Sequence, residues 1–179
     1  MKRILIVFAH PAMEKSKIQK QLLASAATLQ SLTIHDLYEQ YPDFAINVHH
    51  EQELLRIHDT IVFQFPFYWY SSPSLLKEWL DLVLEYGFAY GHSGTALAGK
   101  QLLIATSTGG SQEVYQHEGH NKYTMREFLH PFEATASLCG MSYLPPFIIH
   151  GAHQLRTNEE AIQQQADRYR EHLLLLQTS

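Results

Sequence analysis

Residues Thr60–Val83 read TIVFQFPFYWYSSPSLLKEWLDLV and pass from a strand pattern to a helical pattern at one aromatic turn. Thr60–Phe65 is a short apolar run rich in β-branched and aromatic residues, which is typical of a strand buried on both faces. Ser72 then offers a capping hydroxyl, and Pro73 a proline for the first helical position. Beyond them the apolar residues recur at helical spacing, at Leu75, Leu76, Trp79, Leu80 and Val83. The stretch therefore predicts a buried strand that is followed at once by an amphipathic helix.

The same alternation of strand and helix patterns continues on both sides of this stretch. Further strands are expected at residues 4–9, 32–36, 101–106 and 143–149, the last weakened by Pro145 and Pro146. Further helices are expected at about residues 16–30 and 51–57, in a segment ending near 139–140, and after a Thr157-x-x-Glu160 capping box. Five strands alternating with helices predict one α/β domain over residues 1–179, a doubly wound parallel sheet of the flavodoxin-like order 2-1-3-4-5 with helices on both faces. No GxGxxG follows the first strand, which argues against a direct nicotinamide-dinucleotide site.

Composition and charge exclude several classes of protein. The 179 residues carry a formal net charge of −5 and no lysine- or arginine-rich run, so no nucleic-acid partner is expected. The single cysteine, Cys139, permits no internal disulfide and suits a reducing compartment. The apolar run Ile4–Ala9 is too short for a signal peptide, and no run approaches the roughly 18 apolar residues of a membrane span. We therefore expect a cytoplasmic protein.

The loops after predicted strands 1, 3 and 4 are rich in polar, glycine and aromatic residues. They read HPAMEKSKIQ at His10–Gln19, PFYWYSS at Pro66–Ser72 and STGGSQEVY at Ser107–Tyr115. In the predicted order these three strands are neighbours, and the carboxyl ends of parallel strands meet at one edge of the sheet. The loops should therefore converge at the topological switch point, where folds of this kind bind ligands.

Each of these loops has a functional and a purely structural interpretation. Ser16 at the start of a helix favours a bound phosphate, but it can equally be only an N-cap. The aromatic run after Pro66 can support a flat ring or simply fill the core. Gly109–Gly110 lets the backbone approach a ligand closely or only makes a turn, and His10 contacts a ligand or only closes its loop.

Several motifs together resemble the NAD(P)H:quinone oxidoreductases of the flavodoxin-like fold. They are FAHP at Phe8–Pro11, DLY at Asp36–Tyr38, FPFYWYSSPSLLKEWLD at Phe65–Asp81, GFAY at Gly87–Tyr90, and STGGS at Ser107–Ser111 followed by Tyr115. Three more motifs resemble the ancillary proteins of glutathione-regulated potassium efflux systems: YPDF at Tyr41–Phe44, GTALAGK at Gly94–Lys100 and LPPF at Leu144–Phe147. The likeness spans nearly the whole chain in order.

The resemblance implies a non-covalently held flavin, FMN in preference to the FAD of larger relatives. Residues that match the phosphate side are His10, Ser16, Lys17, Ile18 and Gln19, the last standing where the family usually has asparagine. Residues that match the segment beside the isoalloxazine ring are Pro66, Phe67, Tyr68, Trp69 and Tyr70. Residues that match the loop at the pyrimidine end are Ser107, Thr108, Gly109 and Gly110.

The resemblance also implies a tyrosine and a histidine that assist hydride transfer. Tyr115 matches the tyrosine. The histidine's position falls on Asn121, so the catalytic candidate is His120, one residue earlier. His117 is a further candidate without a matching position.

The implied activity is a two-electron, ping-pong cycle in which NAD(P)H, as co-substrate, reduces the flavin and leaves before a quinone binds. The implied partners are a second copy of the chain, which would partly roof the flavin, and a potassium/proton antiporter at the inner face of the cell membrane. The alternative is a non-catalytic regulatory subunit that docks on such an antiporter. A metal protein is a third interpretation, prompted by twelve histidines, but no HExxH or CxxC spacing supports it. The sequence leaves the choice between NADH and NADPH open.

Overall fold

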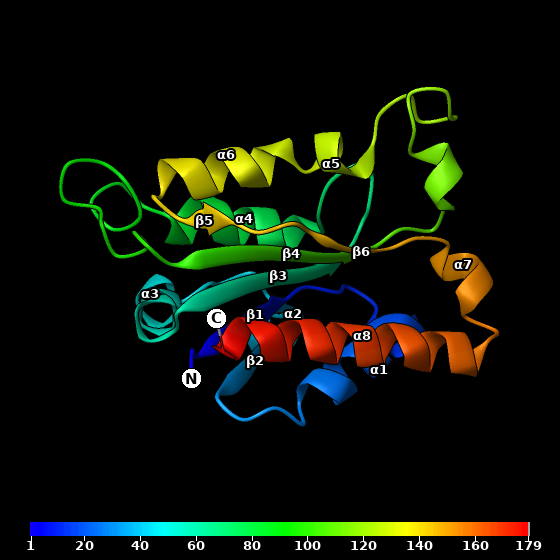
Figure 1. Ribbon diagram of the computed structural model, residues 1–179. Coiled ribbons are helices and arrows are strands. Elements are labelled where there is room, and N and C mark those ends of the chain that lie inside the picture. The colour runs from blue at the N-terminus through cyan, green and yellow to red at the C-terminus, as the bar shows by residue number, and fades with distance from the viewer. Residues whose placement is uncertain (179) are drawn as a thin grey trace.

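A parallel β-sheet runs through the middle of the computed structural model, which describes residues 1–178 (Figure 1). Its strands are β1 (Ile4–Phe8), β2 (Leu32–Asp36), β3 (Thr60–Pro66), β4 (Gln101–Ser107), β5 (Ser142–Tyr143) and β6 (Phe147–Ile149). They lie in the order β2-β1-β3-β4-β5, and β6 also pairs with β4. All of these pairings are parallel. The predicted order 2-1-3-4-5 is therefore confirmed.

The predicted fifth strand is divided into two short pieces. β5 pairs with the start of β4, where Gln101 lies opposite Ser142, and β6 pairs with its end, where Ala105 lies opposite Phe147. Between the pieces stand Pro145 and Pro146, which have no N–H to donate to the ladder. The prolines therefore interrupt the strand rather than only weaken it.

Helices cover both faces of the sheet. They are α1 (Lys17–Ala26), α2 (Leu37–Gln40), α3 (Val48–Ile57), α4 (Ser74–Val83), α5 (Met125–Phe128), α6 (His130–Leu138), α7 (Ala152–Leu155) and α8 (Glu159–Thr178), with 3-10 turns η1 (Met13–Lys15) and η2 (Gln112–Val114). Figure 1 shows α1 and α8 on one face and α4 and α6 on the other. Among residues 1–178, no helix combines the length and the apolar character that crossing a bilayer requires.

The two faces of β1 show how the sequence divides the core. Ile4, Ile6 and Phe8 pack with the side chains of α1 and α8, while Leu5 and Val7 pack with those of α3, α4 and α6. All five are fully buried, and each such burial stabilises the fold by roughly 1.5–3 kcal/mol. The expected apolar faces of the flanking helices are buried as well: Leu75, Leu76, Trp79 and Val83 on α4, and Ile162, Ala166, Tyr169 and Leu173 on α8.

Two helix starts differ from the sequence-based expectation. α4 begins one residue late, with Pro73 at the N-cap position and no capping side chain, so Ser72 is not the cap. α8 is capped by Asn158, whose Oδ1 accepts the N–H of Ala161 at 3.0 Å, and the expected capping box is absent because the Thr157 hydroxyl donates backward to Gln154. Serine, threonine and asparagine are all good caps, so a run of them does not fix which one caps the helix.

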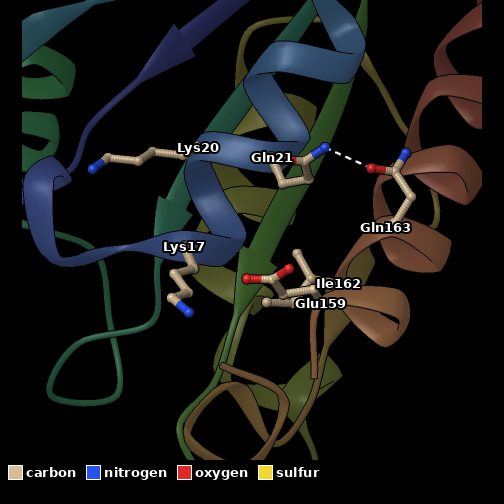
Figure 2. A pocket seen from close by; sticks show the side chains of 6 residues that line it. All are labelled: Lys17, Lys20, Gln21, Glu159, Ile162 and Gln163. Carbon is tan, nitrogen blue, oxygen red and sulfur yellow. Dashed lines mark hydrogen bonds between the residues drawn. The ribbon is translucent and has the colours of Figure 1, made fainter. Parts of the chain in front are cut away.

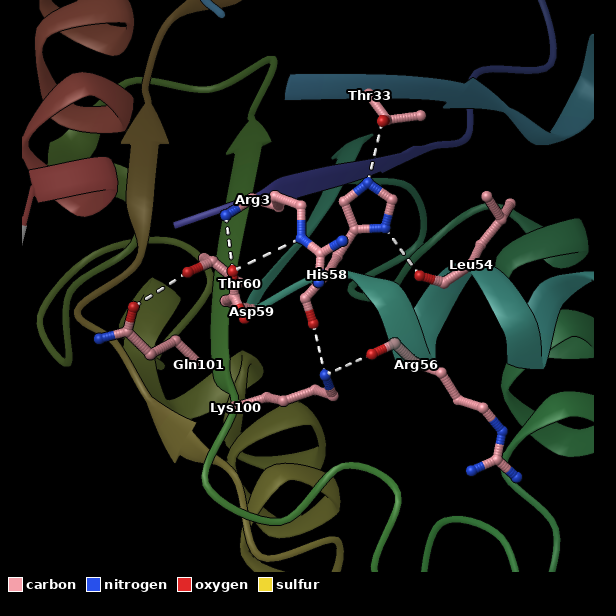
Figure 3. Close-up of polar contacts among 9 residues, drawn as sticks. All are labelled: Arg3, Thr33, Leu54, Arg56, His58, Asp59, Thr60, Lys100 and Gln101. Carbon is pink, nitrogen blue, oxygen red and sulfur yellow. Dashed lines mark hydrogen bonds and ion pairs between the residues drawn. The ribbon is translucent and has the colours of Figure 1, made fainter. Parts of the chain in front are cut away.

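The amino edge of the sheet is closed by polar contacts that fix the end of α3 (Figure 3). His58 donates from Nδ1 to the Leu54 carbonyl at 2.7 Å and faces the Thr33 hydroxyl at 2.9 Å. The Lys100 ammonium donates to the carbonyls of Arg56 and His58 at 3.0 and 2.5 Å. A cation at a helix C-terminus satisfies carbonyls that the helix itself cannot. This edge is therefore structural, and the opposite edge is left for a ligand site.

Candidate functional site

A cavity of about 530 Å³ opens at the carboxyl edge of the sheet. The three expected loops converge there, which places eleven of the predicted site residues on its wall: His10, Ser16, Lys17, Ile18, Pro66, Phe67, Tyr68, Ser107, Gly109, Gly110 and Tyr115. A volume of this size is typical of small-molecule sites. A second hollow of about 420 Å³ lies between α1 and α8, shares only Lys17 with the cavity, and is lined by polar side chains and Ile162 (Figure 2).

The start of α1 gives one end of the cavity the character of an anion site. Ser16 caps the helix, because its Oγ accepts the N–H of Gln19 at 3.2 Å. The N–H groups of Lys17 and Ile18 precede the first bond of the helix, which Lys20 N–H donates to the Ser16 carbonyl. Free amides, the positive end of the helix dipole and the ammonium groups of Lys15 and Lys17 all favour a negative charge here.

His10 adds a hydrogen-bonding imidazole to the same wall. It is 6% exposed, and its Nδ1 accepts the N–H of Ala12 at 3.1 Å. Burial lowers the pKa of the imidazole, although the charge of Glu14 opposes this shift. The neutral ring must therefore carry its proton on Nε2, where it can be donated to a ligand.

A buried hydrogen-bond chain links α8 to the cavity. The Tyr169 hydroxyl donates to Gln64 Oε1 at 2.8 Å, Gln64 Nε2 donates to Gln19 Oε1 at 2.8 Å, and Gln19 Nε2 donates to Ser107 Oγ at 2.9 Å. Because Ser107 accepts this last bond and lines the cavity, its own proton is directed toward whatever the cavity holds.

This chain corrects the expectation for Gln19. Its amide is fully buried and engaged with Gln64 and Ser107, so it does not reach the helix start as a phosphate ligand. The long glutamine side chain lets the amide reach Gln64 on β3 and Ser107 at the end of β4 instead. Gln19 thus acts on the cavity through Ser107.

The aromatic turn after β3 places its side chains in three different environments. Phe67 is 9% exposed and packs with Tyr115 and Met125, whereas Tyr68 borders the cavity and Trp69 is 93% exposed. Trp69 and Tyr70 line a neighbouring hollow of about 210 Å³ with Phe67, Tyr115 and Asn121. The run is therefore neither wholly core nor wholly a ring-binding surface.

The backbone of this turn is strained. Tyr68 and Ser71 exchange backbone hydrogen bonds of 3.0 and 2.9 Å, and between them Trp69 and Tyr70 have φ of 48° and 60°. Two successive left-handed residues are the pattern of a type I′ turn, which normally requires asparagine or glycine. Such residues cost about 1–3 kcal/mol each and are held mainly at functional sites.

The Gly109–Gly110 loop is glycine-rich because space is limited. A Cβ on Gly109 would lie 2.6 Å from Nε2 of His153, and one on Gly110 would lie 2.7 Å from Cγ2 of Val114. Thr108 anchors the loop, because its N–H donates to the Ile149 carbonyl and its hydroxyl to the Gly110 carbonyl, both at 2.8 Å. Thr108 is fully buried and does not line the cavity.

The two predicted catalytic residues differ in placement. Tyr115 is 8% exposed on the cavity wall, and burial raises the pKa of its hydroxyl, while hydrogen bonding to Thr108 opposes the shift. His120 is exposed and lines neither the cavity nor the neighbouring hollow. Asn121 takes its place and accepts a hydrogen bond of 3.4 Å from the Tyr70 hydroxyl. His117 instead lies 3.7 Å from the Glu127 carboxylate.

A fourth segment, which follows β6, completes the wall and was not anticipated from the sequence. Ala152, His153 and Arg156 line the cavity, and the His150 ring lies 5.8 Å from that of Tyr115. Burial lowers the pKa of His150, which Glu113 partly opposes. The signal was present in the predicted strand order, because the carboxyl end of the fifth strand reaches the same edge beside the fourth.

Comparisons with known proteins agree with this architecture. Residues 2–173 match the family model for the flavodoxin-like fold. The chain is 47% identical over 171 residues to the glutathione-regulated potassium-efflux system ancillary protein KefG of Pectobacterium carotovorum subsp. carotovorum (strain PC1), covering 96% of this chain and 92% of that protein.

Two solved structures share the fold over almost their full length. General stress protein 14 from Treponema denticola, in complex with FMN, has a TM-score of 0.93 at 38% identity and covers 98% of this chain and 99% of that one. An NADPH-quinone reductase from P. pentosaceus has a TM-score of 0.86 at 37% identity and covers 95% and 96%.

Proposed function

The chain belongs to the flavodoxin-like fold family, and from this premise we propose that it is an FMN-dependent NAD(P)H:quinone oxidoreductase that moves two electrons from NAD(P)H to a quinone. The observation that carries the proposal is the convergence of the α1 start and the Gly109–Gly110 loop in one cavity of about 530 Å³. The FMN complex of the Treponema protein and the name of the P. pentosaceus reductase support the same assignment.

The residues at the α1 end fit the phosphate of FMN. The amides of Lys17 and Ile18 and the hydroxyl of Ser16 supply donors, and the His10 Nε2–H supplies another. Lys15, Lys17 and Arg156 supply positive charge in a chain that is negative overall. A dianionic group is stabilised by such a combination of amides and cations.

The residues at the other end fit a flat heterocycle. Pro66, Phe67 and Tyr68 would border the ring on one side, and the Ser107 hydroxyl with the Gly109 and Gly110 amides would supply donors. When bound, FMN supplies the hydride chemistry that side chains lack. The donors preorganised by this loop would stabilise negative charge as it develops.

Tyr115 is the residue we assign to the acceptor. Its raised pKa keeps the phenol protonated at physiological pH, so it can donate a hydrogen bond to a quinone oxygen as that oxygen becomes negative. Its ring is held by Phe67 and Phe128, whose centroids lie 6.1 and 6.3 Å away. A tyrosine held in this way acts without reorganisation.

The exposed aromatics beside the cavity support a protein partner. Tyr68, Trp69 and Tyr70 are 40%, 93% and 52% exposed, and aromatic residues are enriched at interfaces. They would meet a second copy of the chain in a homodimer. The likeness to KefG supports a second candidate function, in which the chain regulates a potassium efflux antiporter by docking, with or without catalysis.

Absorbance of the purified chain and mass analysis of any released chromophore test the assignment, followed by quinone reduction with NADH and with NADPH. Bound FMN and turnover are expected. A colourless chain that takes up no flavin and oxidises neither nicotinamide would refute the enzyme and leave the docking role.

The variant Gly109→Val localises the site. We expect it to lose FMN, because the new side chain enters the cavity. Its apoprotein should unfold at the parent's temperature, because the exposed His153 ring can rotate away from the new side chain. The double variant Gly109→Val/His153→Ala is the control, because it removes the His153 ring that a Cβ on Gly109 would meet at 2.6 Å. FMN should stay lost in this variant too, since the valine side chain itself blocks the cavity. Equal FMN content in parent and Gly109→Val would exclude this loop from the site.

A further inference from the structure

A second cluster of functional side chains lies away from the cavity, where the end of β2 meets the start of α3. His35 on β2 and the adjacent residues His50 and Glu51 on α3 place their nitrogen and oxygen ligand atoms within 4.8 Å of one another. None of the three lines the cavity. The sequence gives no metal-binding spacing here, because fourteen residues separate His35 from His50 and only the fold brings them together.

Glu51 is the centre of this cluster. Its side chain is 0% exposed, Oε1 accepts hydrogen bonds from His35 Nε2 at 2.8 Å and from the Tyr41 hydroxyl, and Oε2 accepts one from Trp79 Nε1 at 2.7 Å. Burial alone would raise the pKa of the carboxyl, but the three hydrogen bonds outweigh burial and lower it. The Glu51 carboxyl is therefore a buried acceptor of three hydrogen bonds that lies beside the ring nitrogens of His35 and His50.

We propose that His35, His50 and Glu51 bind a divalent transition-metal ion, of which Zn²⁺ fits best. Two imidazoles and one carboxylate form a donor set that Zn²⁺ accepts, with water in the fourth position. The fourth position would lie on the side of His50, because His50 is exposed, whereas the side chains of His35 and Glu51 are 10% and 0% exposed.

The geometry needs only small adjustments. Zinc bonds of 2.0–2.2 Å in a tetrahedral site place neighbouring ligand atoms about 3.3 Å apart. The 2.8 Å separation between His35 Nε2 and Glu51 Oε1 would open by about 0.5 Å, and the widest spacing of 4.8 Å would close by about 1.5 Å, which rotation of the exposed His50 side chain can supply. Tyr41 and Trp79 keep their hydrogen bonds to the carboxylate and orient it, as outer partners of metal ligands do.

The competing interpretation is a buried His35–Glu51 ion pair that needs no metal. The two interpretations differ at His50, because the ion pair consists of His35 and Glu51 alone, whereas a metal ion would need His50 as its third ligand. His49 is its matched control, because it is the neighbouring histidine on the same helix and is also exposed.

The test uses the full-length, untagged chain after treatment with a chelator. Zn²⁺ binding is measured by equilibrium dialysis, and Co²⁺ is added in a parallel experiment for its visible absorption bands. We expect the parent and His49→Asn to bind one Zn²⁺ per chain with the same affinity and to give the intense Co²⁺ bands of a tetrahedral site. His50→Asn should bind at least tenfold more weakly and lose those bands.

Equal Zn²⁺ affinity in His50→Asn and His49→Asn would overturn the proposal, since any bound metal would then sit on other histidines. No saturable binding by the parent would also overturn it. Because His50 is exposed, its variant is expected to unfold at the parent's temperature without metal, and unfolding is recorded for each variant. The experiment needs no flavin or quinone, so its outcome is independent of the proposed oxidoreductase activity.

Discussion

Gln64 lies at the middle of the buried hydrogen-bond chain, and we expect its replacement by leucine to be strongly destabilising. The side chain is 0% exposed, accepts from Tyr169 at 2.8 Å and donates to Gln19 at 2.8 Å. Gln64→Leu keeps much of the side-chain volume but leaves the Tyr169 hydroxyl and the side-chain oxygen Oε1 of Gln19 without partners. Each unsatisfied buried group costs about 1–3 kcal/mol, so the free energy of unfolding should fall by about 2–6 kcal/mol.

Tyr169, which donates the hydrogen bond to Gln64, allows a stronger test of this hydrogen-bond chain. Tyr169→Phe alone leaves only Gln64 Oε1 unsatisfied and should cost about 1–3 kcal/mol. In the Gln64→Leu background the same change removes a hydroxyl that already lacks a partner. There it should restore about 1–3 kcal/mol, so the double variant is more stable than Gln64→Leu.

Urea unfolding of the four apoproteins, followed by circular dichroism, measures these differences if the slopes agree. Tyr143→Phe is the control, because the Tyr143 hydroxyl is buried and has no partner among the described residues, so its removal should not destabilise the chain. If Tyr169→Phe lowers the free energy of unfolding by the same amount in the parent and in Gln64→Leu, the two residues are not coupled. The buried hydrogen-bond chain would then not be a source of stability.

Three further outcomes are expected. Gln19→Leu frees the Ser107 hydroxyl from its acceptor role, so FMN titration of the apoprotein should show roughly two- to tenfold weaker binding, which unchanged affinity would contradict. Trp69→Asn with Tyr70→Gly suits a type I′ turn and should raise the free energy of unfolding by about 1–3 kcal/mol, so a loss of stability would show that the turn is not strained. Burial lowers the folded-state pKa of His10, His58 and His150 below the unfolded value, so the unfolded chain binds more protons near pH 6. Stability present above about pH 6.5 should therefore be lost as pH falls through the folded-state values, and a melting temperature that stays flat from about pH 7 to pH 5 would contradict this.

The architecture could be predicted because it depends on patterns that many residues share. The continuous apolar runs of β1 and β3 reflect burial on both faces, and the apolar stripes of α4 and α8 repeat over several turns. Single-residue expectations were less secure. Ser72 and Thr157 both have cap chemistry, yet Pro73 and Asn158 occupy the cap positions, because the chain entering each helix decides the register.

The wall of the cavity was predictable where a loop follows a neighbouring strand, and less so where one side chain's direction decides. Gln19 lies in the expected loop but turns inward, because its longer side chain can reach Gln64 and Ser107. His120 is one residue from Asn121, which lines the neighbouring hollow, and the turn Gly119–Lys122 leaves His120 exposed. His153 and Arg156 also line the cavity. They could have been predicted if the segment after the fifth strand had been considered together with the loops after strands 1, 3 and 4.

The interruption at Pro145 and Pro146 also hinders pairing between the sheet edges of two copies of the chain. The outer border of the sheet beside β4 consists of β5 with two residues and β6 with three, separated by a segment without N–H donors. Another polypeptide cannot add a long strand to so short and broken a template, which is one of the ways natural sheets avoid fibril-like growth. A continuous, proline-free border would offer that template, so the two prolines oppose edge-to-edge pairing as well as divide the strand.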